Sequence, residues 1–90
     1  MPVYHKVSQH DISKETDLVV TIIDGVGGPC AFITDPAQAR DTIPLPVEEA
    51  LASARQMISG DLNPRRLVVV DAHDLWEEQW GRLVPARIGG

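Results

Sequence analysis

The chain has 90 residues and a mass of 9.8 kDa, a length that fits one domain with one modest core. Its hydrophobic fraction of 43% and charged fraction of 23% are typical of a globular domain and argue against disorder. The net charge of -5 argues against a nucleic-acid binder that works through bulk positive charge. No run of apolar residues approaches the roughly 18 that a membrane-spanning helix needs, so we expect no membrane partner.

The cysteine count and the first residues of the chain indicate in which cellular compartment the protein resides. The single cysteine, Cys30, has no partner for an intrachain disulfide, and the first residues lack the apolar core of an export signal. We therefore expect a cytoplasmic protein, and we interpret Cys30 as a small buried hydrophobe. Six arginines against two lysines fit a GC-rich bacterial genome.

The first third of the chain predicts three strands. Residues 2–8 alternate weakly in polarity, and residues 17–23 are β-branched and almost entirely apolar, as in a central strand. The glycine-rich stretch 24–28 then predicts a turn that pairs 17–23 with an antiparallel strand at 30–34. A phosphate-binding loop is the alternative for 24–28, but the stretch lacks the Lys-Ser/Thr of such a loop and precedes a strand.

The clearest element is an amphipathic helix at 46–59. Its apolar residues recur at helical spacing, acidic residues occupy its first turn, and Gly60 fits a left-handed stop. Those apolar residues are Val47, Ala50, Leu51, Ala54, Met57 and Ile58. Before it, residues 37–40 are predicted to form a single helical turn after Asp35-Pro36.

The last third predicts a strand and a short helix. Residues 67–70 form the most apolar stretch and predict a strand. Asp74 with Glu77 resembles a capping box for a helix that ends at Gly81. The order β-β-β-α-β-α indicates an α+β fold, a small mostly antiparallel sheet with the long helix packed on one face. A parallel pair joined through the helix stays open. We expect one domain at 1–84 and a flexible tail at 85–90.

Function is predicted from the placement of the aromatic residues. Trp76, Trp80 and Leu83 share one face of the predicted short helix, and tryptophan is enriched at the centre of protein interfaces. Packing of both indoles against the sheet is the alternative. We expect a small non-catalytic protein of regulatory or adaptor type, without a cofactor, that binds a protein partner or its own copy as a homodimer.

A metal-binding or hydrolytic site is a second hypothesis. Asp71, His73 and Asp74 follow the most apolar strand, and two carboxylates beside an imidazole can bind a divalent cation or hold a general base. His5 or His10 could add a ligand. Strand ending and helix capping explain the same two aspartates without a metal.

Two resemblances to known families complete the predictions. Gly89 and Gly90 are similar to the end of ubiquitin-like and sulfur-carrier proteins, which implies activation of a C-terminal carboxylate. Three strands followed by a helix that starts Pro46-Val47-Glu48-Glu49-Ala50-Leu51 resemble small bacterial β-β-β-α-β domains, including HicB-type antitoxins. That resemblance implies toxin binding and dimerisation through the sheet and helix, and it assigns no role to any single residue.

Overall fold

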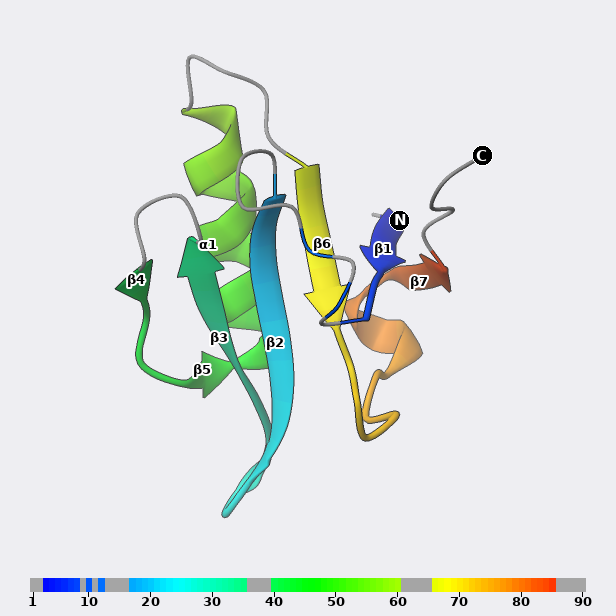
Figure 1. Ribbon diagram of the computed structural model, residues 1–90. Coiled ribbons are helices and arrows are strands. Elements are labelled where there is room, and N and C mark those ends of the chain that lie inside the picture. The colour runs from blue at the N-terminus through cyan, green and yellow to red at the C-terminus, as the bar shows by residue number, and fades with distance from the viewer. Residues whose placement is uncertain are drawn as a thin grey trace.

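The described part of the chain, in a computed structural model, comprises residues 3–8, 10, 12, 17–35, 40–60 and 66–85 (Figure 1). Its elements are β1 (Val3–Lys6), β2 (Asp17–Gly25), β3 (Gly28–Asp35), β4 (Arg40–Asp41), β5 (Leu45–Pro46), α1 (Val47–Ser59), β6 (Arg66–Val70), the 3-10 helix η2 (Glu78–Trp80) and β7 (Arg82–Pro85). The strands form one sheet in the order β4-β3-β2-β6-β1-β7, with β5 also paired to β3. No helix among these residues is long and apolar enough to cross a membrane.

The sheet is mixed. β3 runs antiparallel to β2, β4 and β5, whereas β2 and β6, β6 and β1, and β1 and β7 run parallel. The expectation of a mostly antiparallel sheet is therefore wrong. The reason is that α1 carries the chain across the sheet between β3 and β6, so that β6 lies parallel to β2 rather than beside β3.

The β2–β3 hairpin is the longest pairing and confirms the predicted antiparallel strands. Its register runs from Val19 opposite Thr34 to Gly25 opposite Gly28, where the chain reverses. Gly28 has a φ of 125°, a left-handed value that favours glycine. The outer edge of β3 is covered by the segment that follows, since the Thr42 amide donates to the Ile33 carbonyl at 2.9 Å and Thr42 Oγ1 accepts from the Ile33 amide at 2.9 Å.

Helix α1 lies across one face of the sheet, as predicted. Val47, Ala50, Leu51 and Ala54 are buried, whereas Glu48 and Glu49 are exposed in the first turn, where the helix dipole favours negative charge. Gly60 ends the helix in a right-handed conformation with φ of -87°, not in the left-handed one expected, and its amide donates to the Gln56 carbonyl.

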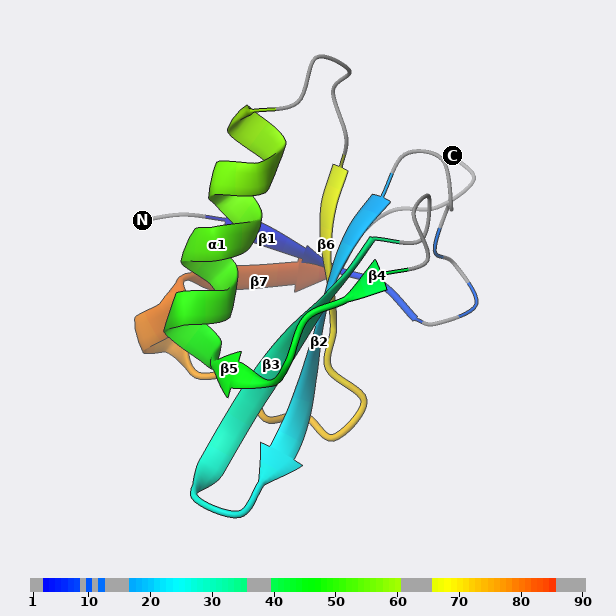
Figure 2. The same ribbon diagram turned by 90° about the vertical axis from the view of Figure 1, so that its left-hand side faces the viewer.

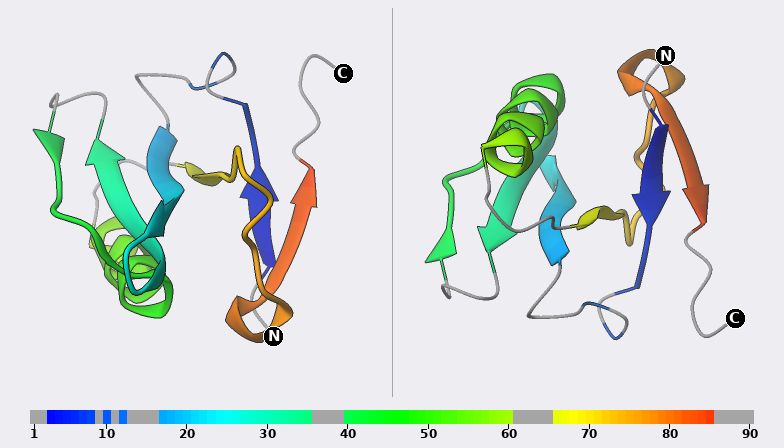
Figure 3. Two further views of the ribbon diagram at one scale, coloured as in Figure 1. Left: turned by 90° about the horizontal axis from the view of Figure 1, so that it is seen from below. Right: turned by 90° about the horizontal axis from the view of Figure 1, so that it is seen from above.

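Two hydrophobic clusters lie on opposite faces of the sheet. The larger one is on the face that carries α1 and η2 (Figure 3). Its buried residues are Tyr4, Leu18, Val20, Ile22, Ala31, Ile33, Val47, Ala50, Leu51, Ala54, Val69 and Trp80. The smaller one, on the other face, contains Val7, Val19, Val68 and Val70, with Ile12 packed against it. Both faces of β2 and β6 are thus covered, which explains their continuous apolar sequences.

A salt bridge joins β2 to β6 where the two strands begin. The Arg66 guanidinium donates from Nε to Oδ1 and from Nη2 to Oδ2 of Asp17, each at 3.0 Å. The Asp17 side chain is fully buried, and the bond raises the pKa of Arg66. The two residues are register partners in the parallel ladder, so this fork fixes the alignment of β6 on β2.

The predicted C-terminal helix is absent from the described residues. Asp74 has a φ of 56°, which no helix N-cap adopts, and only Glu78–Trp80 form a single 3-10 turn. The chain then enters β7, a strand that the sequence analysis missed along with β4 and β5. The sheet twists strongly, so that β1 and β7 run across the view of Figure 2 while β2 and β3 run steeply.

Candidate functional site

The turn after β6 is held by one buried carboxylate. Asp71 is 2% exposed, and its two oxygens accept hydrogen bonds from the amides of Leu75 and Trp76, each at 2.8 Å. The Asp74 amide donates to the Asp71 carbonyl. Asp71 therefore folds residues 71–76 back over the end of the sheet and sets the position of Trp76.

Three aromatic rings gather beneath this turn. The rings of Tyr4 and Trp76 meet edge to face with centroids 5.4 Å apart, and those of Trp76 and Trp80 do the same at 5.4 Å. The Trp76 indole donates from Nε1 to the Gly81 carbonyl at 3.1 Å. Edge-to-face contact and a satisfied indole N–H hold Trp76 in one orientation although it is only half-buried.

An open groove of about 710 Å³ lies beside this cluster. Trp76, Leu83 and Pro85 give it an apolar lining, and Gly81 lies beside them. Charged side chains complete the lining: Lys6, Asp74, Glu78 and Arg82. We call this surface the Trp76 groove.

The four charged side chains of the Trp76 groove have no partner in the described part of the chain. None of them forms an ion pair or a side-chain hydrogen bond there. Two cations and two anions leave the groove without net charge, on a chain whose formal charge is -5. The groove thus combines an apolar patch with charges of both signs that have no partner among the described residues.

The predicted surface of Trp76, Trp80 and Leu83 is divided by the fold. Trp76 and Leu83 both line the groove, but Trp80 is 9% exposed and belongs to the main core. Trp80 lines a separate hollow of about 260 Å³ with Tyr4, Arg55 and other residues. Burial raises the pKa of the Tyr4 phenol there, while the Arg55 cation opposes that rise.

Four other groove residues were missed by sequence reasoning: Lys6, Glu78, Arg82 and Pro85. Asp74 was singled out, but as a metal ligand or helix cap rather than as part of this surface. Arg82 and Pro85 belong to β7, and Lys6 reaches the groove because β1 pairs with β7, with Lys6 opposite Pro85. A local signal for β7 does exist, since the apolar pair Leu83-Val84 stands between Gly81 and Pro85, which commonly bound strands.

The residues of the metal hypothesis are not brought together around one point. Asp71 uses both carboxylate oxygens on amides, while His73, Asp74, His5 and His10 are exposed. Within the described ranges, no three His, Cys, Asp or Glu side chains are grouped so that they could hold a metal ion. The hypothesis stays a prediction for a metal titration.

Two further candidates are placed only in part. Gly89 and Gly90 fall outside the described residues, so the carrier hypothesis stays a prediction. Cys30 is half-buried, and its thiol donates to the Gly28 carbonyl at 3.6 Å within the hairpin.

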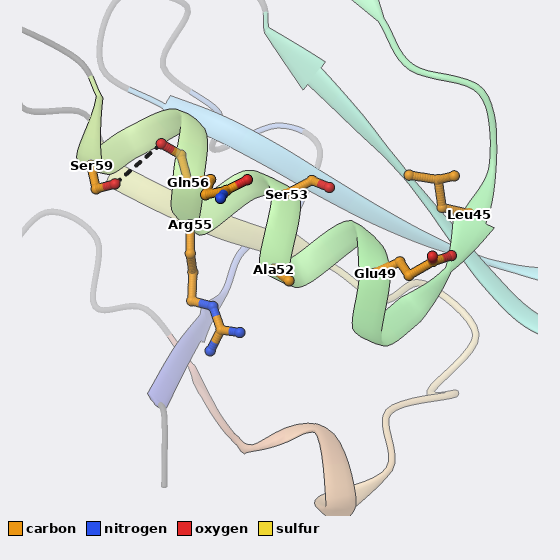
Figure 4. Close-up of a pocket in the computed structure, with 7 residues that line it drawn as sticks. All are labelled: Leu45, Glu49, Ala52, Ser53, Arg55, Gln56 and Ser59. Atoms are coloured by element: carbon orange, nitrogen blue, oxygen red, sulfur yellow. Dashed lines mark hydrogen bonds between the residues drawn. The ribbon is translucent and has the colours of Figure 1, made fainter.

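A second hollow, of about 730 Å³, lies over the outer face of α1 (Figure 4). Its lining residues are Leu45, Glu49, Ala52, Ser53, Arg55, Gln56 and Ser59. Arg55 and Leu45 extend on opposite sides of the helix, and the hydrogen bond drawn joins Ser59 to the Gln56 carbonyl. The side chains do not converge on a common point, so this surface is a weaker candidate than the Trp76 groove.

Comparison with protein-family models, with curated proteins and with solved structures found no match to this chain.

Proposed function

We propose that this chain is a small protein-contact module that binds another polypeptide in the Trp76 groove. The observation that carries the proposal is the half-buried Trp76 indole, fixed by Tyr4, Trp80 and the Gly81 carbonyl at the side of an open hollow. A rigid aromatic side chain loses little conformational entropy on binding, and tryptophan is enriched among the residues that dominate interface energetics.

The rim of the groove supports the same function. Lys6, Asp74, Glu78 and Arg82 have no ion-pair partners of their own in the described ranges, so a partner can pair with them without first breaking a bond. Charges of both signs around an apolar lining favour one orientation of the bound polypeptide. The proposal thus keeps Trp76 and Leu83 as contact residues and assigns Trp80 to their support.

Site-directed photo-crosslinking in cells that produce the full chain tests this function. A photoreactive residue replaces the exposed Glu78 at the groove, and a second strain carries it at Gln56 on the outer face of α1. We expect discrete adducts with a polypeptide from position 78 that fade when Arg82→Glu is added, and none of these bands from position 56. Equal labelling at both positions, or no adduct at 78, would contradict the proposal.

A further inference from the structure

The tip of the β2–β3 hairpin carries the most exposed large hydrophobic residue in the described part of the chain. Val26 has a relative exposure of 112%, against 75% for Ile43 and 53% for Val3. The hairpin projects past the end of the sheet in both Figure 1 and Figure 2. The valine therefore stands at the end of an arm and is as accessible as a side chain in an extended peptide.

Glycines on either side make this tip narrow. Gly25 and Gly28 are required by the fold, since a Cβ on Gly25 would meet Cys30 Sγ at 2.8 Å and Gly28 has a φ of 125°. Gly27 is different, because a Cβ there would meet nothing within 4 Å and its φ is not in the left-handed region. The backbone thus tolerates a side chain at 27, yet Val26 is the only side chain at the turn.

We propose that the Val26 tip of one copy of this chain inserts into the Trp76 groove of a second copy. The inference rests on the proposed function and names the partner. A groove of about 710 Å³ has ample room for a valine on a glycine-flanked turn, and the apolar part of its lining, Trp76, Leu83 and Pro85, matches an apolar side chain. The only charged residue of the tip, Asp24, then meets a rim that carries the cations Lys6 and Arg82 beside the anions Asp74 and Glu78. Among the described residues neither cation has an ion-pair partner, so either one is available to the Asp24 carboxylate.

The geometry of this contact is head to tail. Val26 is not among the residues that line the groove, so each copy presents a tip and a groove on separate surfaces. Such a heterologous contact leaves one free tip and one free groove in every dimer. Assembly therefore continues until a ring closes or the protein becomes too dilute.

Sedimentation velocity of the purified full chain over a range of concentrations tests the contact. We expect concentration-dependent association that Val26→Ser weakens by about ten- to a hundredfold, the effect of removing one buried valine from an interface. Ile43→Ser removes a different exposed apolar residue and should leave association unchanged. Equal effects of the two substitutions would overturn the inference.

Mixing two assembly-defective variants separates head-to-tail contact from a symmetric one. Val26→Ser keeps an intact groove, and Arg82→Glu keeps an intact tip. At a protein concentration where the unaltered chain assembles but the weakened contact does not, each variant alone should be monomeric. Mixed together, they should form a 1:1 dimer that grows no further. Arg55→Glu, with the same charge change on α1, should assemble like the unaltered chain. Self-assembly of Val26→Ser that is as tight as that of the unaltered chain would show a contact that does not use the tip and would overturn the inference.

The two proposals fail in distinguishable ways. An unaltered chain that stays monomeric at every concentration would overturn the self-assembly, while crosslinks from position 78 to a different polypeptide would still uphold the contact function. The absence of any adduct at 78 removes the function itself.

Discussion

Asp71 is the side chain that holds the turn beside the groove. It is buried, and it is the acceptor for two amides of the turn at Leu75 and Trp76. We predict that Asp71→Ala lowers the free energy of unfolding by about 2–4 kcal/mol, because two half-buried amides lose a charged acceptor. Urea denaturation measures the change. His73→Ala, at an exposed residue nearby, is the control, and we expect it to change the free energy of unfolding by less than about 0.5 kcal/mol. A similar loss in both variants would contradict the role of Asp71.

Tyr4 reports directly on the core beneath Trp76. It is the only tyrosine, and burial raises its pKa above the ordinary 10.0. Absorbance titration of the phenol should therefore show a midpoint above 10.0 in the folded protein and near 10.0 in denaturant. As the pH rises past 10.0, the Tyr4 phenol loses its proton in the unfolded chain before it does so in the folded protein. The free energy of unfolding therefore falls as the pH rises towards the folded-state pKa. Tyr4→Phe should remove the absorbance change and reduce that fall. A folded midpoint at or below the denatured one would show that the phenol is not desolvated.

Within the β2–β3 hairpin, Gly25 and Gly27 differ in the space that surrounds them. A Cβ on Gly25 would meet Cys30 Sγ at 2.8 Å and the Gly28 carbonyl oxygen at 2.9 Å. We predict that Gly25→Ala destabilises the fold by about 1–3 kcal/mol through overpacking. Gly27→Ala, in open space, should stabilise it by about 0.4–1 kcal/mol through the unfolded chain. Thermal unfolding of both variants gives the comparison, and a destabilised Gly27→Ala variant would show that the turn needs glycine there.

The elements predicted from sequence are those whose signals are local. The period of α1 and the glycine-rich turn between β2 and β3 are both contained within a short window. The predicted C-terminal helix was wrong because of one side chain. The Asp71 carboxylate accepts the hydrogen bonds of the Leu75 and Trp76 amides, and Asp74 adopts a φ of 56°. No local pattern discloses where a carboxylate will find its donors, and a capping-box sequence is compatible with both outcomes.

The site was predictable in part for the same reason. The sequence singled out Trp76 and Leu83 from their spacing, and both line the groove. It grouped Trp80 with them by helical geometry, whereas the real chain turns Trp80 into the core. Lys6 could not be foreseen, because it joins the site only through the pairing of β1 with β7.

At the scale of the whole molecule, one cluster joins α1 to the C-terminal aromatic residues. Tyr4, Leu51 and Trp80 are members of the same core cluster. We predict that tryptophan fluorescence, which reports on residues 76 and 80, and far-ultraviolet circular dichroism, which reports mainly on α1, change in a single coincident urea transition. Leu51→Ala should shift both curves together, by about 2–5 kcal/mol. Separate midpoints would show that the aromatic end unfolds independently.

The position of β1 affects how this protein folds while it is synthesised on the ribosome. β1 comes first in the chain, yet both of its neighbours, β6 and β7, are made last. The β2–β3 hairpin can form as soon as it emerges, but Tyr4 and its strand must wait for more than half of the chain to be synthesised. Contacts between residues so far apart in sequence form slowly, and until they form both edges of β1 are unpaired and exposed. The closing step of folding is then the arrival of β6 and β7 around β1, the same step that creates the Trp76 groove, so an incomplete chain cannot bind through it.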